Sequence, residues 1–130
     1  MIVEYKYQEL TGKIIGAAME VHNHLGNGFQ EVIYQRALSI EMNLQDIAHE
    51  REKEMPLTYK NFNIGTRRVD FFVDEKIMVE IKAVKELEDV HLAQAINYLE
   101  AYNMEIGLLI NFGNTRLQFK RIMIPNKNKS

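Results

Sequence analysis

The sequence predicts an α/β sandwich with a mixed central β-sheet. Three segments carry apolar residues at helical spacing, and other segments are rich in Val, Ile and Phe, which favour strands. The run EIGLLINF at residues 105–112 is almost entirely apolar, as expected of a central strand buried on both faces. The order helix, helix, strands, helix, strand, strand is therefore that of a layered α/β domain.

Three amphipathic helices are expected. The first covers residues 8–25 and ends at a Gly-Asn-Gly turn, the second runs from after Gly28 to about Asn43, and the third covers residues 90–102. The expected buried residues are Leu10, Ile14, Ala17, Val21 and Leu25 in the first, Ile33, Ala37, Ile40 and Leu44 in the second, and Leu92, Ala95, Leu99 and Tyr102 in the third.

The strands are expected between and after these helices. Residues 47–64 predict two strands around a turn at Lys60-Asn61, and the first of them is an exposed edge protected by charge. We expect no functional role for this segment. Residues 115–124 predict the last strand.

A predicted β-hairpin brings two acidic residues together. Its strands, residues 69–73 and 77–84, flank a polar three-residue turn. With that turn, Asp70 lies opposite Glu80, whereas a two-residue turn would put the two carboxylates on opposite faces. Asp70, Glu80 and Lys82 then share one face, and like charges so placed destabilise a sheet unless something neutralises them.

A divalent cation would neutralise these carboxylates, because Mg²⁺ prefers carboxylate, water and phosphate oxygens. Lys82 would then lie beside the metal. The alternative is a solvated strand face with incidental charges, which is the usual explanation of an isolated D…ExK pattern. However, Phe72 and Met78 share the expected face with the charges. We therefore expect a sheet covered on both sides, with the charged cluster opening at one end.

Asp70 and Glu80-Ile81-Lys82 resemble the motif of the PD-(D/E)xK nuclease superfamily. Residues 28–34, GFQEVIY, are similar to the pattern that names the GxxExxY proteins, a small bacterial and archaeal branch of that superfamily. The segments VHNHLGNGFQEVIYQRAL, QAINYL and GLLINFG resemble the same branch, so the resemblance covers nearly the whole chain. It implies a restriction-endonuclease-like α/β/α sandwich with an αβββαβ core.

The resemblance also implies a metal-dependent hydrolytic site. Asp70 and Glu80 would bind Mg²⁺ or Mn²⁺, together with the backbone carbonyl of Ile81. Lys82 would orient the attacking water or help to deprotonate it.

Two helices would complete that site. The resemblance gives Glu31 a role at the metal, directly or through water, although the helix dipole alone favours a glutamate in a first turn. Tyr34 could hydrogen-bond Glu31 or simply pack. Gln94 and Tyr98 are four residues apart and share a helix face. In relatives such a pair borders the nucleic-acid groove, and the alternative is a neutral polar pair on the surface. Arg68 is the basic residue expected to help bind the substrate.

Length and composition indicate a single domain at residues 1–125 with a polar tail at residues 126–130. The chain has no cysteines, which excludes disulfides and thiolate metal sites. No apolar run approaches the roughly 18 residues that a membrane helix needs. We expect a cytoplasmic protein with no membrane contact.

The formal net charge is −2, so charge alone would not hold DNA. Nucleic acid, expected to be DNA, would need a local basic patch, and scattered solubilising charge explains the same residues equally well. The candidates are Arg67, Arg68, Lys82, Lys85, Arg116, Lys120, Arg121, Lys127 and Lys129. A homodimer is expected because two copies would double the metal sites and basic patches.

The predicted function is that of a metal-dependent nuclease. A non-catalytic domain that binds nucleic acid or protein on the same scaffold is the alternative. An enzyme acting on some other phosphate ester is a third hypothesis.

Overall fold

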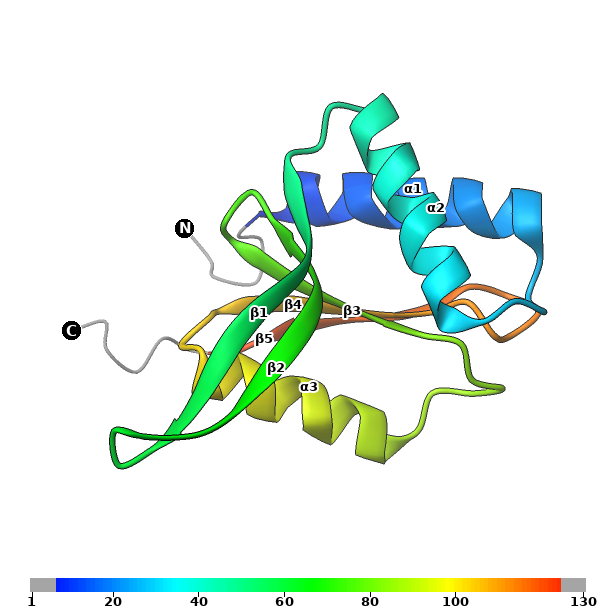
Figure 1. Cartoon of the computed structure of the whole chain (residues 1–130). Coiled ribbons are helices and arrows are strands. Elements are labelled where there is room, and N and C mark those ends of the chain that lie inside the picture. Colours follow the sequence, from blue (N-terminus) through cyan, green and yellow to red (C-terminus); the bar gives the residue numbers. More distant parts are fainter. Residues whose placement is uncertain (1–6, 125–130) are drawn as a thin grey trace.

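The computed structural model describes residues 7–124, which form a three-layer α/β/α sandwich (Figure 1). The elements are α1 (Gln8–Leu25), α2 (Glu31–Leu44), β1 (His49–Tyr59), β2 (Phe62–Val73), β3 (Ile77–Lys82), α3 (Asp89–Ala101), β4 (Ile106–Asn111) and β5 (Gln118–Met123). Helices α1 and α2 lie on one side of the sheet and α3 lies on the other (Figure 1). The expected fold class is confirmed.

The five described strands form one mixed sheet in the order β1-β2-β3-β4-β5. Neighbours are antiparallel except for β3 and β4, which are parallel. Parallel neighbours need a long crossover, and α3 supplies it. The edge strand expected within residues 47–64 is β1.

Apolar side chains pack on both faces of the sheet. The α1/α2-side core contains Ile14, Ile15, Ala17, Ala18, Val21, Tyr34, Leu38, Met42, Ile47, Phe71, Val73, Ile77, Val79, Ile81, Ile106, Leu108, Ile110 and Phe112. The α3-side core contains Val69, Met78, Ala95, Leu99, Leu109 and Ile122. Every residue of β4 is buried, as predicted for a central strand.

Helix α2 buries a different stripe from the expected one. Its buried residues are Tyr34, Gln35, Leu38 and Met42. The expected stripe leaves Ile40 61% and Leu44 73% exposed, and Ile33 is exposed as well. Both stripes have helical spacing, so the pattern along the helix could not choose between them. The sheet and α1 decide the choice by the side from which they approach.

Strand β2 is longer than predicted. The second strand expected within residues 47–64 is the beginning of β2, which continues to Val73. The turn at Lys60-Asn61 is confirmed: both residues have left-handed backbone angles, with φ of 47° and 70°, as tight hairpin turns require. The β1–β2 hairpin projects beyond the rest of the sheet (Figure 1).

The pairing of β1 with β2 is interrupted next to Asp70. Glu52 has a left-handed φ of 56°, and it does not pair with Asp70 although positions on both sides do pair. Phe71 packs in the α1/α2-side core, whereas Val69 packs in the α3-side core. The buried face of β2 therefore changes at Asp70.

Two further predictions concern the C-terminal tail and membrane-spanning helices. The predicted domain end at residue 125 and the polar tail at residues 126–130 lie outside the described residues. Among the helices of residues 7–124, none has the length and apolar character that a membrane span requires.

Candidate functional site

Asp70 joins three elements of the fold. The β2–β3 hairpin has the predicted three-residue turn, and its backbone pairing extends as far as Phe71 with Val79. One residue further, Asp70 Oδ2 accepts a hydrogen bond from the backbone N–H of Ile81 at 2.8 Å. Asp70 Oδ1 accepts a hydrogen bond from the side-chain amide of Gln35 in α2, also at 2.8 Å. Both carboxylate oxygens of Asp70 therefore have a donor.

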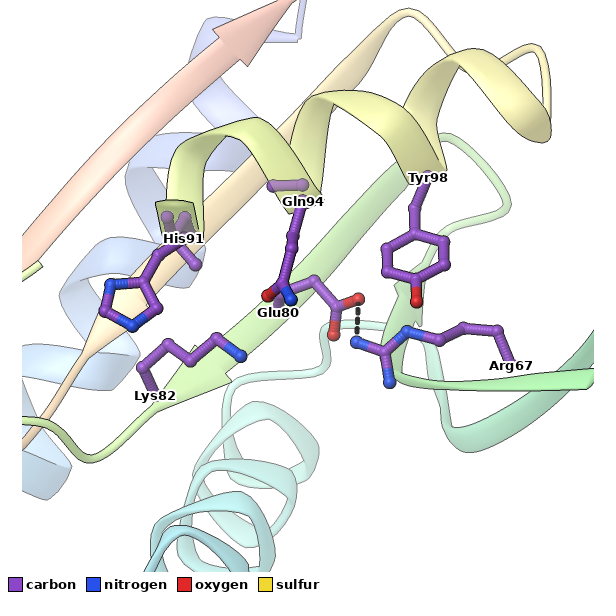
Figure 2. A pocket seen from close by; sticks show the side chains of 8 residues that line it. Arg67, Glu80, Lys82, His91, Gln94 and Tyr98 are labelled. Carbon is purple, nitrogen blue, oxygen red and sulfur yellow. Dashed lines mark hydrogen bonds and ion pairs between the residues drawn. The ribbon is translucent and has the colours of Figure 1, made fainter. Parts of the chain in front are cut away.

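Glu80 is a buried acid on the α3 side of β3, only 3% exposed. Its Oε1 accepts a hydrogen bond from Nη2 of Arg67 at 2.7 Å (Figure 2). Its Oε2 is buried without a hydrogen-bond partner among the described residues. Burial raises the pKa of Glu80 to about 7; the charge of Arg67 opposes this rise and the neighbouring Asp70 carboxylate adds to it. The ion pair with Arg67 therefore does not fully offset the cost of burying a charged Glu80.

Helix α3 holds Arg67 against Glu80. The Arg67 guanidinium lies 4.5 Å from the centre of the Tyr98 ring, a distance typical of cation–π contacts. Tyr98 in turn stacks on Tyr102 with ring centres 6.3 Å apart. The Nε of Arg67 is buried and has no partner among the described residues. Two buried polar atoms, one on Arg67 and one on Glu80, are therefore unsatisfied at the same place.

Lys82, His91 and Gln94 surround a small hollow beside Glu80 (Figure 2). Its volume is about 10 Å³, room for roughly one water molecule. The lining residues are Arg67, Glu80, Lys82, His91, Gln94, Ala95, Tyr98 and Leu109. The side chains of Lys82 and Gln94 extend toward Glu80 from β3 and α3 (Figure 2). Four of the residues predicted for the site therefore line this hollow.

A second hollow, of about 250 Å³, lies on the α2 side of Asp70. Its lining residues are Glu31, Val32, Gln35, Glu52, Arg68 and Asp70. Arg68 forms ion pairs of 3.2 Å with both Glu52 and Glu54. Partial burial raises the pKa of Glu31, and Asp70 adds to the rise, while Lys82 and Arg67 lower it. Glu31 thus lies within electrostatic reach of the Asp70, Lys82 and Arg67 charges.

Of the three residues expected to share one face, Glu80 and Lys82 line one hollow, while Asp70 lies close to Glu80 and is also bonded to Gln35 of α2. Glu80 and Lys82 line the hollow under α3, whereas Asp70 lines the hollow beside α2. The reason is the change of buried face in β2, which turns the Asp70 side chain toward Gln35. The two carboxylates nevertheless remain electrostatic neighbours where β2 and β3 separate, because the Asp70 charge raises the pKa of Glu80.

Tyr34 anchors the loop before α2 and is completely buried. Its hydroxyl donates a 2.6 Å hydrogen bond to the carbonyl of Gly26 and accepts one from the backbone N–H of Phe29 at 3.1 Å. Its ring stacks on Phe112 with centres 4.7 Å apart. Of the two predicted roles, Tyr34 packs and pins the loop, and its hydroxyl bonds these backbone groups. It thereby sets where α2 begins and where Glu31 lies.

Asn111 fixes the backbone that follows Lys82. Its Oδ1 accepts hydrogen bonds from the backbone N–H groups of Val84 and Gly113, at 2.9 and 3.0 Å. Its Nδ2 donates to the carbonyl of Val84 at 2.9 Å. A Cβ on Gly113 would lie 2.3 Å from that carbonyl oxygen, so only glycine fits there. The end of β3 is therefore held rigidly against the end of β4.

Gln35 and Glu52 bind predicted site residues but were not themselves predicted for the site. Gln35 follows Glu31 by four positions and so shares its helix face, a spacing that could have identified it. Glu52 belongs to the strand for which no functional role was expected, yet it lines the Asp70 hollow and pairs with Arg68. No local pattern predicts this, because it depends on the left-handed backbone of Glu52 and on the pairing with β2.

The carboxylate oxygens of the site could serve as ligands of a hard divalent cation. Within residues 7–124, no three His, Asp or Glu side chains converge as a preformed metal cluster. Even so, two neighbouring carboxylates, Asp70 and Glu80, carry like charge, and Glu80 has a buried oxygen without a donor. Carboxylate oxygens are the ligands that Mg²⁺ and Mn²⁺ prefer. The residues present therefore fit such an ion.

Comparisons with known proteins point to one family. A family model described as the PD-(D/E)XK nuclease superfamily matches residues 8–122. No curated protein matches the sequence. Among solved structures, the chain is similar to one described as the crystal structure of SSO0001, with a TM-score of 0.58 and 23% identity. That match covers 95% of this chain and 61% of the other, so this chain spans less than two thirds of that protein.

Proposed function

The chain belongs to the PD-(D/E)XK nuclease superfamily and has a restriction-endonuclease-like fold, and on that premise we propose that it hydrolyses phosphodiester bonds in nucleic acid. The observation that carries the proposal is the buried Glu80. An acid with an unsatisfied oxygen, a raised pKa and a second carboxylate nearby is an unusual and costly feature. Such features cluster at functional sites, and this one lies in a hollow with Lys82.

We propose that Asp70 and Glu80 hold Mg²⁺ or Mn²⁺, together with the backbone carbonyl of Ile81. Glu31 would contribute from α2, through a water molecule. When bound, the ion would polarise the phosphate and stabilise the negative charge that develops on it. In its absence, Arg67 provides the positive charge beside Glu80.

Lys82 would act on the attacking water. Its amine lines a hollow with room for about one water and extends toward Glu80 (Figure 2). From that place it can orient the water and receive or return its proton. Asn111 holds the backbone after Lys82, which fixes the end of the strand from which the Lys82 side chain extends.

Gln94, Tyr98 and Arg68 would bind the substrate. Gln94 and Tyr98 project from α3 into the Glu80 hollow (Figure 2). Arg68 lines the opposite hollow, where it is paired with glutamates that a phosphate would have to displace. The substrate groove would therefore connect the two sides of the β2–β3 hairpin.

Finer assignments belong to the same proposal. The GFQEVIY segment supports membership of the GxxExxY branch. We further propose DNA as the substrate, a single domain at residues 1–125, a homodimeric state and a cytoplasmic location.

A non-catalytic domain that binds nucleic acid or protein is the second candidate. The Arg67–Glu80 ion pair favours it, because this pair neutralises the acid without any metal. In that case the charged cluster would serve only to recognise phosphate or an acidic partner.

Cleavage of labelled single- and double-stranded DNA and RNA, with Mn²⁺ and after chelation, tests the proposal. Wild-type protein should cleave one of these substrates only with metal, and Glu80→Gln should abolish both cleavage and Mn²⁺ binding measured by calorimetry. Glu9→Gln, which changes an exposed acid of α1, is the matched control and should do neither. Nucleic-acid binding that needs no metal, with no cleavage of any substrate, would establish the second candidate instead.

A further inference from the structure

The outer face of α2 carries an apolar stripe that the fold leaves largely uncovered: three of its residues are exposed, and only Ala37 packs partly against the α1/α2-side core. The stripe consists of Ile33, Ala37, Ile40 and Leu44, which follow one another at intervals of four, three and four residues. Ile40 and Leu44 are 61% and 73% exposed. Exposed leucine and isoleucine side chains in a row cost solvation free energy, and a contiguous apolar patch usually marks an interface.

A groove between α1 and α2 lies beside this stripe. It has a volume of about 270 Å³ and is lined by Glu20, Val21, His24, Leu25, Ala37, Ile40 and Glu41. Two stripe residues, Ala37 and Ile40, are thus also part of the groove wall. The stripe and the groove form one continuous surface, which offers both a ridge and a depression.

We propose that this surface binds a second copy of the same chain, with the two α2 helices parallel about a two-fold axis. Intervals of four, three and four residues are those of the a and d positions of a coiled coil, where each side chain inserts between residues of the facing helix. An identical partner supplies an identical stripe, so the surface is complementary to itself, as a two-fold interface requires.

The charges on either side of the stripe select the parallel orientation. With Ile33 and Ile40 at d positions, Arg36 falls at g and Glu41 at e, on opposite flanks of the stripe. In a parallel pair, Arg36 of one protomer faces Glu41 of the other, and the two-fold axis creates this ion pair twice. In an antiparallel pair, Arg36 would instead face Arg36. A helix without this pattern of charges could not form ion pairs on both sides of the stripe.

The proposed interface leaves the candidate active site open. Gln35, which binds Asp70, lies on the buried side of α2. The stripe lies on the other side of the helix, so two copies would present two separate hollows beside Asp70. The inference therefore stands or falls independently of the proposed nuclease activity.

Charge reversal at the two flanks tests the proposal. Sedimentation equilibrium of the full chain should show a dimer for the wild type. Arg36→Glu alone and Glu41→Arg alone should each raise the dissociation constant about 10-fold or more, since each converts two attractive contacts into two repulsive ones. The double variant should return it to within about 3-fold of the wild-type value, because the pairs are restored in reversed polarity.

Ile40→Asp should give a monomer, and Val90→Asp is its matched control. Val90 is 57% exposed on α3, close to the 61% of Ile40, and lies outside the stripe. Circular dichroism melting should show that both variants fold, because neither side chain is buried. A wild-type monomer throughout the micromolar range, a dimer unaffected by Ile40→Asp, or a double variant as weak as the single ones would each overturn the proposal. A wild-type monomer would leave the stripe to a different protein.

Discussion

Replacing Glu80 with glutamine should remove the pH dependence of stability that this residue imposes. The ordinary pKa of a glutamate is 4.5, and in the folded protein the pKa of Glu80 rises to about 7. The folded chain therefore holds the proton more tightly than the unfolded chain does. The resulting stabilisation is fully present below pH 4.5 and is lost as the pH rises through about 7.

The magnitude follows from the size of the shift. Between pH 5 and pH 8, ionisation of Glu80 should remove roughly 2 to 3 kcal/mol from the free energy of unfolding of the wild type. Glu80→Gln keeps an oxygen that can accept the Arg67 hydrogen bond but has no proton to lose. The variant should therefore gain on the wild type by this amount over the same pH range.

Urea unfolding at pH 5, 6, 7 and 8, without added metal, measures this difference. The comparison uses the change with pH, so a constant loss from the altered Arg67 contact cancels. Glu9→Gln, at an exposed position, should track the wild type at every pH. Parallel curves for the wild type and Glu80→Gln would show that Glu80 is not protonated preferentially in the fold, and the reasoning about its burial would be refuted.

Three further substitutions test other contacts of the site. Asp70→Asn should lower the free energy of unfolding by about 1 to 3 kcal/mol, because a carboxamide offers one acceptor oxygen where the Ile81 and Gln35 donors now have two. Mn²⁺ titration should show lost affinity, and unchanged stability would contradict the hydrogen bonds. Lys82→Ala should lower kcat by about 100-fold with a smaller change in KM, and a change confined to KM would make Lys82 a phosphate contact. Tyr34→Phe should cost about 1 to 2 kcal/mol in urea unfolding, because the Gly26 carbonyl and the Phe29 N–H both lose their partner. A neutral result would argue that water replaces the hydroxyl.

Much of the fold could be predicted from local patterns. Helix α1 ends where glycine follows the last apolar residue, and its predicted bounds agree with the structure. The β2–β3 turn could be predicted because three polar residues separate two strands of Val, Ile and Phe. Such features depend on residues that are close in the sequence, and the physical preferences of those residues act wherever the chain lies.

The sequence predicted which residues lie near the candidate site better than it predicted how they are arranged. Four residues predicted for the site, Glu80, Lys82, Gln94 and Tyr98, lie around one hollow. Asp70, however, lies in a second hollow, because β2 changes its buried face at that residue. That change arises where pairing between β1 and β2 is interrupted, and it involves Glu52, which is distant in sequence.

The sequence by itself thus determined which residues are able to form helices, strands and an acidic cluster. Only the tertiary structure decided which of the two apolar stripes of α2 is buried, since both have helical spacing and the sheet and α1 can cover just one. It also decided that Arg67 neutralises Glu80 and that Gln35 binds Asp70. The physical reason is the same in each case: hydrogen bonds, ion pairs and burial act through space, and the partner is set by how the elements pack.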